Sequence, residues 1–313
     1  MDAEIKWLAE SPDGVFTTAD ARAVGLSPFD LVRICRRGHL VHLARGIYAV
    51  PTAEPLSAEQ AHRRLAAGVC RLYPDAVLTH HSAVVVHGLP VFDLEAGLGR
   101  VLLARPVSME RLAQQWIIRP RPMWLGSCSE RGLPTSDVAS TLVMHALEHG
   151  AMAGVVALDR ALHQGAVQLT EVETTAGNVA GWPRSHRVRT MLAYADGSSE
   201  SVGESRLRVD LSVAGIDVEP QVVIHDDDGR FVARVDLAVR GSKVVIECDG
   251  AVKYADGGPE ALMAEKRRED ALRRLGYIVV RFAWADLYRP RLLVTRVRDA
   301  MAASLGKVDL HSA

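Results

Sequence analysis

The segment 234–250 (RVDLAVRGSKVVIECDG) places three carboxylates in two adjacent β-strand patterns, and no other feature constrains the fold of this chain as strongly. In the second pattern, residues 244–249, side chains alternate between two faces, so Glu247 and Asp249 share one face of a strand. The link 240–242 is short enough for a hairpin, which lays the strand of Asp236 beside the strand of Glu247. The sequence therefore predicts two antiparallel strands with three carboxylates close together.

Asp236, Glu247 and Asp249 are candidate ligands of a Mg²⁺ (or Mn²⁺) ion. A hard divalent ion prefers oxygen ligands, and it activates water and neutralises phosphate charge in hydrolytic nucleases. The alternative is a solvated strand face that carries acids. We favour the metal site because an acid pair inside a run of Val and Ile is costly unless it is paired or coordinated.

The residues around this hairpin predict an α/β unit. We expect a first strand over 217–225, a turn rich in Asp and Gly over 226–229, and a second strand over 231–239. A helix over 260–275 ends at Gly276 and is followed by a strand over 277–284. The helix carries a basic face of Lys266, Arg267, Arg268, Arg273 and Arg274.

This order of elements, with ECDG, a basic helix and LGYIVVRFAW in succession, resembles the very-short-patch-repair-like endonucleases and the wider PD-(D/E)xK nuclease superfamily. The resemblance implies a restriction-endonuclease-like fold in which Asp236 and Glu247 bind metal, Asp249 lies beside them, and Glu204 is the acid of the helix before the sheet. The lysine of the superfamily, expected two residues after Glu247, is Asp249 here. Lys253 or Lys266 would then act in catalysis, since a lysine ammonium on a long stem can reach one site from different backbone positions. If neither lysine takes this role, the nuclease-like domain is inactive.

The first fifty residues carry a second pattern, that of a winged helix. The expected elements are a helix over 3–10, a turn over 11–14, a helix over 19–24 capped by Thr18 and closed by Gly25, a helix from Ser27-Pro28 to Arg37, and a hairpin over 38–50. Basic residues concentrate on the third helix and the wing, which suits phosphates and groove edges. The candidate DNA-binding residues are Arg33, Arg36, Arg37, His39, His42 and Arg45. Docking of a protein is the alternative use of such a module.

This arrangement, with GIYAVP closing the wing, resembles the N-terminal domain of the AbiEi-type antitoxins of type IV toxin–antitoxin systems. The resemblance covers about the first fifty residues and implies binding to double-stranded DNA, repression of the protein's own operon, and a nucleotidyltransferase-like toxin as a partner to test. Three functions stay open: a Mg²⁺-dependent DNA endonuclease, a non-enzymatic repressor and antitoxin with a degenerate nuclease domain, and a scaffold that binds protein at both ends.

The middle of the chain predicts an α-rich region with amphipathic helices over 133–144 and 151–164. The motif THHSAVVVHGLP, residues 79–90, resembles the middle region of AbiEi-like proteins and holds three histidines. His80 and His81 diverge on any regular element, and no cysteine or acid completes a known ligand pattern. We therefore favour packing and helix capping over a metal site for these histidines.

Length and composition fit three domains: a winged helix over 1–52, an AbiEi-like middle domain over 53–196 and an endonuclease-like domain over 197–313. The net charge of −1 predicts that nucleic-acid binding depends on local patches. Four cysteines without a C-x-x-C pair indicate free thiols in a reducing compartment. Because we find neither a membrane-spanning run nor a signal peptide, we expect a cytoplasmic protein without a membrane partner.

Overall fold

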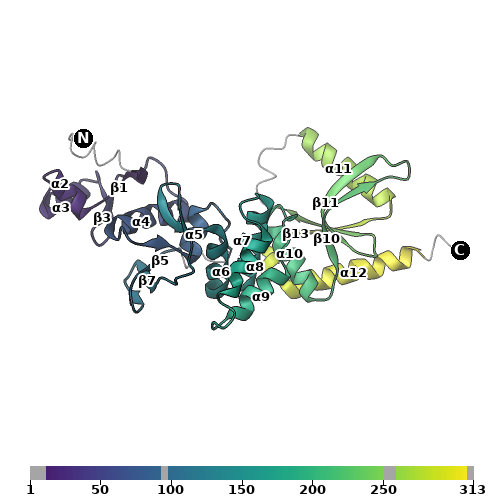
Figure 1. The fold of residues 1–313 in the computed structure, drawn as a ribbon. Helices are drawn as coiled ribbons and strands as arrows, with labels where there is room; N and C mark the ends of the chain where they lie inside the picture. Colours follow the sequence, from purple (N-terminus) through teal and green to yellow (C-terminus); the bar gives the residue numbers. More distant parts are fainter. Residues whose placement is uncertain (1–11, 93–97, 250–258, 309–313) are drawn as a thin grey trace. The chain divides into compact units, whose positions relative to one another are not determined.

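The computed structural model describes three stretches of the chain, residues 12–92, 98–249 and 259–308. Contacts divide the chain into two compact units: Met1–Ala157 with Ala166–Ala193, and Leu158–Gly165 with Tyr194–Ala313. The expected mixed α/β architecture is confirmed (Figure 1), and the division into three domains at 52 and 196 stays a prediction. Among the helices of these stretches, none is both long and apolar enough to cross a membrane.

The first unit begins with the two described helices and the sheet of a winged helix. After the short turn η1 (Pro12–Gly14) come β1 (Val15–Thr17), α2 (Thr18–Ala23), α3 (Pro28–Arg36), β2 (Val41–Ala44) and β3 (Ile47–Ala49), and the antiparallel strands lie in the order β1-β3-β2. The expected hairpin and third helix are confirmed. The predicted helix over 3–10 lies outside the described residues.

Two details of this region differ from the sequence analysis. The cap of α2 is Thr17 and not Thr18, because the Thr17 hydroxyl accepts the Asp20 amide while the Asp20 carboxylate accepts the Thr17 amide. Strand β1 was not predicted, since three residues are too few to show an alternating pattern.

The expected α-rich middle region is confirmed only in part, because its helices α4 to α9 are accompanied by a six-stranded sheet, built from residues 77–136 in the order β6-β7-β5-β4-β9-β8. Its strands are β4 (Val77–Leu78), β5 (Val101–Arg105), β6 (Arg111–Leu112), β7 (Trp116–Pro120), β8 (Ser127–Glu130) and β9 (Leu133–Ser136). Helices α4 (Ala58–Leu72) and α5 (His80–Val86) belong to the same region. Strands of two to five residues are stabilised by pairing with distant strands, so their sequences carry little local pattern.

The helices that follow the sheet are α6 (Val138–His149), α7 (Ala151–His163), α8 (Leu169–Gly177) and α9 (Ser185–Ala193). The predicted helix over 151–164 is confirmed. The helix predicted over 133–144 begins only at Val138, where Asp137 is the N-cap, because residues 133–136 pair with β8 as strand β9.

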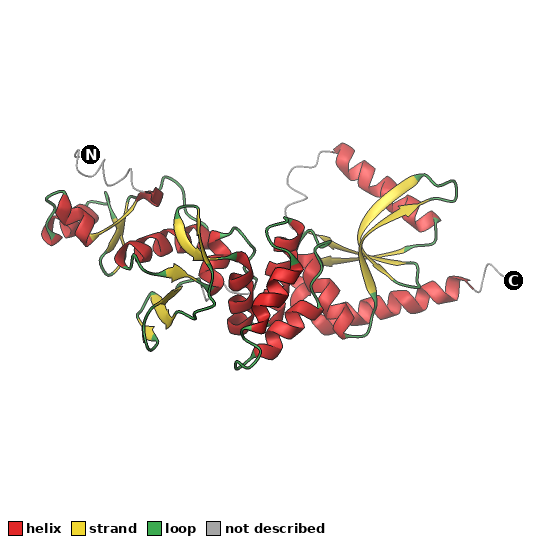
Figure 2. Cartoon of the chain, in the orientation of Figure 1, coloured by secondary structure: helices red, strands yellow, loops and turns green. Residues whose placement is uncertain are grey.

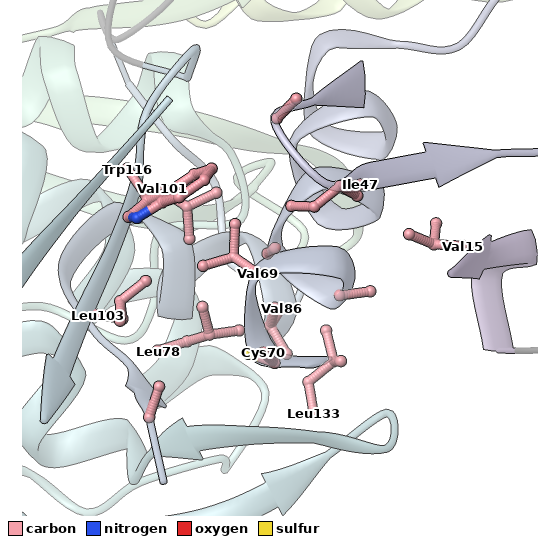
Figure 3. Packing of buried hydrophobic residues seen from close by; sticks show 14 of the residues in the cluster. Val15, Ile47, Val69, Cys70, Leu78, Val86, Val101, Leu103, Trp116 and Leu133 are labelled. Carbon is pink, nitrogen blue, oxygen red and sulfur yellow. The ribbon is translucent and has the colours of Figure 1, made fainter. Parts of the chain in front are cut away.

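One hydrophobic core joins the winged-helix strands to α4 and to the six-stranded sheet. Figure 3 shows Ile47 of the small sheet near Val69 of α4, and Val15, Leu103 and Trp116 belong to the same cluster. At Gly68 on α4, an added Cβ would overlap the Ile47 side chain. A residue without a side chain is therefore required where α4 meets strand β3.

The second unit contains the predicted order of strand, hairpin, strand, helix and strand. Its elements are α10 (Val202–Val213), β10 (Val218–His225), β11 (Phe231–Val239), β12 (Val244–Asp249), α11 (Pro259–Arg274), β13 (Ile278–Ala283), η2 (Trp284–Tyr288) and α12 (Pro290–Val308). The sheet order is β10-β11-β12-β13, with the first three strands antiparallel and β13 parallel to β12. A parallel pair needs a crossover, which here includes α11.

Helices cover both faces of this sheet (Figure 2). Val244 and Ile246 of β12 pack with α10 and α12, whereas Val245 packs with Leu272 of α11. The predicted alternation along β12 is therefore confirmed, and Glu247 falls on the α11 face.

Candidate functional site

The first candidate site is the outer face of α3, which is positioned by a strong helix start. Ser27 is the N-cap, Pro28 is the first helical residue, and the Ser27 hydroxyl and Asp30 carboxylate are 2.6 Å apart. Hydrogen bonds from the Ser27 side chain and backbone hold the pKa of Asp30 below its usual range. Leu31 and Ile34 are buried beneath the helix, so the opposite face is exposed to solvent.

All six candidate DNA-binding residues of this region are exposed. Arg33 lies 2.6 Å from Asp30, which offsets part of its charge. Within the described part of the chain, no carboxylate forms an ion pair with Arg36 or Arg37. The remaining members follow in the chain order of the wing: His39 after α3, His42 on β2, and Arg45 in the turn to β3.

Sequence reasoning missed two apolar residues on the same face, Phe29 and Val32. The Phe29 side chain is 89% exposed and that of Val32 48%. They line one surface hollow together with Pro28 and the three arginines of α3. The helical period could have revealed them, because positions 29 and 32 lie opposite the buried positions 31 and 34.

The second candidate site surrounds Glu247 on β12. This residue is 6% exposed, and its carboxylate lies between two guanidinium groups, 3.1 Å from Arg281 Nε and 2.7 Å from Arg268 Nη2. The contact of Glu247 Oε1 with Arg268 lacks hydrogen-bond geometry, although the charges are close. The predicted burial of this acid in an apolar strand is confirmed, and arginines supply its counter-charge.

Arg281 on β13 extends this network to α11. Its guanidinium group also contacts Glu265 at 2.7 Å and Glu269 at 2.6 Å. Partial burial alone would lower the pKa of Arg281, but Glu269 and Glu247 together raise it above its usual range. Arg268 was expected on the basic face of α11 and instead turns toward the sheet, so internal ion pairs neutralise part of the charge predicted for that face.

Asp236 lies where β11 changes face. Ala233 and Val235 pack on the α11 side, whereas Leu237 and Val239 pack with α10 and α12. Regular alternation would keep these four residues on one face. At the switch, Asp236 Oδ2 accepts the Cys248 amide at 2.9 Å, so the carboxylate reaches β12 beside Glu247.

Strand β10 shows a matching irregularity at Gln221. This residue has φ of 55°, a left-handed conformation, and it falls between the pairs Pro220↔Leu237 and Val222↔Val235. Gln221 therefore lies opposite Asp236. Its side-chain amide donates to Glu204 Oε2 at 2.8 Å, and the same oxygen accepts the Glu200 amide at 2.8 Å. The predicted helix acid Glu204 is thus buried at the N-terminal turn of α10 and held by β10.

The described side chains do not by themselves form a divalent-metal site. Among the described residues, no three His, Cys, Asp or Glu side chains are arranged to hold an ion, and two arginines already neutralise Glu247. The Asp249 side chain and Lys253 lie outside the described residues, and Lys266 is exposed on α11. The metal prediction on Asp236, Glu247 and Asp249 stays a prediction.

His80 and His81 of the middle region are buried, as the packing interpretation predicted, whereas His87 is half-buried. His81 Nε2 donates to the Arg100 carbonyl at 2.8 Å, so His81 Nδ1 accepts from His149 Nε2 at 3.0 Å. His62 donates to the Leu98 carbonyl, and His62 Nε2 accepts the Ser82 hydroxyl at 2.8 Å. His145 is fully buried, and neither ring nitrogen has a hydrogen-bond partner among the described residues. The rings of His62 and His81 each donate through one nitrogen and accept through the other, which requires the neutral form of imidazole.

Comparison with known proteins supports a DNA-binding regulator at the N-terminal end of the chain. Two uncharacterized proteins of Mycobacterium tuberculosis, from strains CDC 1551 / Oshkosh and ATCC 25618 / H37Rv, are each 30% identical to this chain over 142 residues, which is 45% of this chain and 51% of theirs. The match thus spans about half the length of these curated relatives. Residues 3–51 match the family described as "Transcriptional regulator, AbiEi antitoxin", a family of transcriptional regulators and antitoxins.

Proposed function

We propose that this protein is a transcriptional regulator that binds double-stranded DNA through α3 and the wing. The observation that carries the proposal is the outer face of α3, where Arg36 and Arg37 are exposed without a carboxylate partner among the described residues. Unpaired exposed arginines on one helix face supply the charge that phosphates require.

The geometry suits the usual placement of such a module on a duplex. The second helix of a helix-turn-helix enters the major groove, and here α3 follows α2 after a short turn that Gly25 makes with φ of 84°. The wing then brings His42 and Arg45 to the flanking backbone. The match of residues 3–51 to antitoxin transcriptional regulators supports the same function.

The antitoxin role follows from that family and implies a toxin partner, for which a nucleotidyltransferase-like protein is the candidate. Co-expression tests this part. A toxic neighbouring reading frame whose growth arrest is relieved by the full chain would support it, and relief that persists after the chain is replaced by a frameshifted copy would contradict it.

DNA binding is tested with the full chain and a labelled duplex that carries the region upstream of its own gene. We expect binding at least tenfold tighter than to a shuffled duplex, and loss of this preference in an Arg36→Ala, Arg37→Ala double variant. Arg230→Ala, which removes one exposed arginine from the turn before β11, is a control for loss of positive charge away from α3 and should bind normally. Equal affinity for both duplexes would contradict sequence-specific regulation.

A second candidate function is DNA cleavage by the second unit. The observation that favours it is the left-handed Gln221 opposite Asp236, because strained non-glycine backbone clusters at functional sites. Three buried or half-buried acids from separate elements, Glu204, Asp236 and Glu247, are each held in place by a defined contact.

Cleavage is tested on plasmid, linear duplex and single-stranded DNA with Mg²⁺ or Mn²⁺. Asp236→Asn and Glu247→Gln keep the side-chain shapes and remove the charges, while Asp228→Asn in an exposed turn is the control. Metal-dependent cleavage that both variants abolish would support a nuclease. Absence of cleavage with duplex binding intact would leave a regulator with an inactive nuclease-like unit.

A further inference from the structure

The outer face of α3 combines an apolar patch with positive charge. Pro28, Phe29 and Val32 form the patch toward the N-terminal end of the helix, and Arg33, Arg36 and Arg37 continue along it toward the other end. Phe29 is the second residue of the helix and is among the most exposed large apolar side chains of the described chain, at 89%. Keeping a phenylalanine in water forgoes the gain that burial would provide.

Charge decides what can cover this patch. Three arginines of the helix line the same hollow as the patch, so the occupant must offer both an apolar contact and a dense array of anions. The major groove of DNA has this combination, since phosphates line its edges and each thymine projects a 5-methyl group into it. The N-terminal residues of a recognition helix are the ones that contact base edges.

We propose that Phe29 and Val32 read the 5-methyl groups of thymines and thereby set the base specificity of this winged helix. This inference rests on the proposed DNA-binding function. The arginines then position the helix on the backbone or read guanine, while the patch selects thymine. Burial of one methyl-sized group corresponds to about a fourfold change in Kd.

The test separates the methyl group from the rest of the base. Duplexes are selected from a randomised library by the full chain, and each thymine of the selected site is replaced in turn by deoxyuridine, which lacks only the 5-methyl group. We expect about fourfold weaker binding at one or two thymines for the native chain. Phe29→Ala should bind more weakly overall and show no further loss on deoxyuridine substitution at the thymine that Phe29 contacts.

Two further variants define the reading. Phe29→Leu keeps an apolar contact and should retain part of the discrimination, whereas Met123→Ala, a change at another exposed apolar side chain of the first unit, should retain all of it. Deoxyuridine without effect at every position, or an effect undiminished in Phe29→Ala, would overturn methyl recognition and leave DNA binding intact. Failure of the full chain to select any duplex would overturn the proposed function together with this inference.

Discussion

Lowering the pH from 7 to 5 is expected to destabilise the first unit, because its buried histidines are held neutral. Burial, which is the largest cause, lowers the pKa of His62 and of His81 to about 4 from the ordinary 6.5. The pKa values of His80 and His145 are lowered well below that value for the same reason. In each case the unfolded chain binds the proton more readily than the folded chain.

The charged groups around the cluster strengthen this effect. Arg119 of β7 lies 3.0 Å from His80 Nε2, and Arg187 of α9 binds the carbonyl of Glu148 near His149. Glu148 of α6 is the opposing carboxylate, but Arg119 already engages it at 2.9 Å. A proton added to His80 would therefore place a cation beside Arg119 and break the hydrogen bond that His80 Nε2 accepts, and a proton added to His81 Nδ1 would break the hydrogen bond that it accepts from His149.

The sign and size of the effect follow from proton linkage. Above pH 6.5 the free energy of unfolding is fully retained, and between 6.5 and about 4 it falls by about 1.4 kcal/mol per pH unit for each such histidine. At pH 5 the loss is about 2 kcal/mol for each of His62 and His81, and their rings, 5.2 Å apart, make the two contributions interdependent. This is a large part of the roughly 5–15 kcal/mol that stabilises a domain.

The assay is urea unfolding between pH 7 and 5, read by pulse-labelling hydrogen exchange in peptides that cover α5 and α6. His81→Gln should reduce the dependence on pH by about 1.4 kcal/mol per unit. Leu142→Ala, at a fully buried position of α6, should lower stability at every pH and keep the native dependence. A native curve that stays flat from pH 7 to 5, or an unchanged slope in His81→Gln, would refute the reasoning.

Three further predictions concern packing, DNA affinity and the second unit. Gly68→Ala should lower the free energy of unfolding by about 1–3 kcal/mol, because the added Cβ would overlap the Ile47 side chain. A urea midpoint equal to that of the native chain would contradict this and show that α4 and β3 can move apart without loss of stability. Arg36→Ala should reduce the slope of log Kd against log salt concentration by about 0.9, because it removes one contact with a DNA phosphate. Titrations at several salt concentrations measure this slope. An unchanged slope would show that Arg36 does not contact the DNA backbone. Arg281→Met should lower the free energy of unfolding of the second unit by about 1–3 kcal/mol in urea, because Glu247 loses a partner in a largely buried network. Arg240→Met, which removes an exposed ion pair, should change this free energy by less than about 0.5 kcal/mol. Equal effects of the two substitutions would show that burial does not strengthen the Arg281 network.

Local sequence patterns were sufficient to predict the structure where the interacting residues lie within a few positions of one another. The start of α3 follows from Ser27, Pro28 and Asp30, which contact one another within four residues. The alternation along β12 and the turn before β11 likewise depend on backbone geometry and neighbouring residues. For this reason the third helix, the hairpins of the wing and of the second unit, and the exposure of the basic residues of α3 and the wing could be predicted from the sequence.

Tertiary structure alone decided the features that depend on distant partners. Glu247 meets Arg281, 34 residues later in the chain, and the six-stranded sheet is built from strands of two to five residues. The face switch at Asp236 lies opposite Gln221 of β10, whose backbone is left-handed. Pairing between distant segments chooses which face a residue occupies and which charge it meets, so the sequence named the acids of the second unit, and the fold determined what surrounds them.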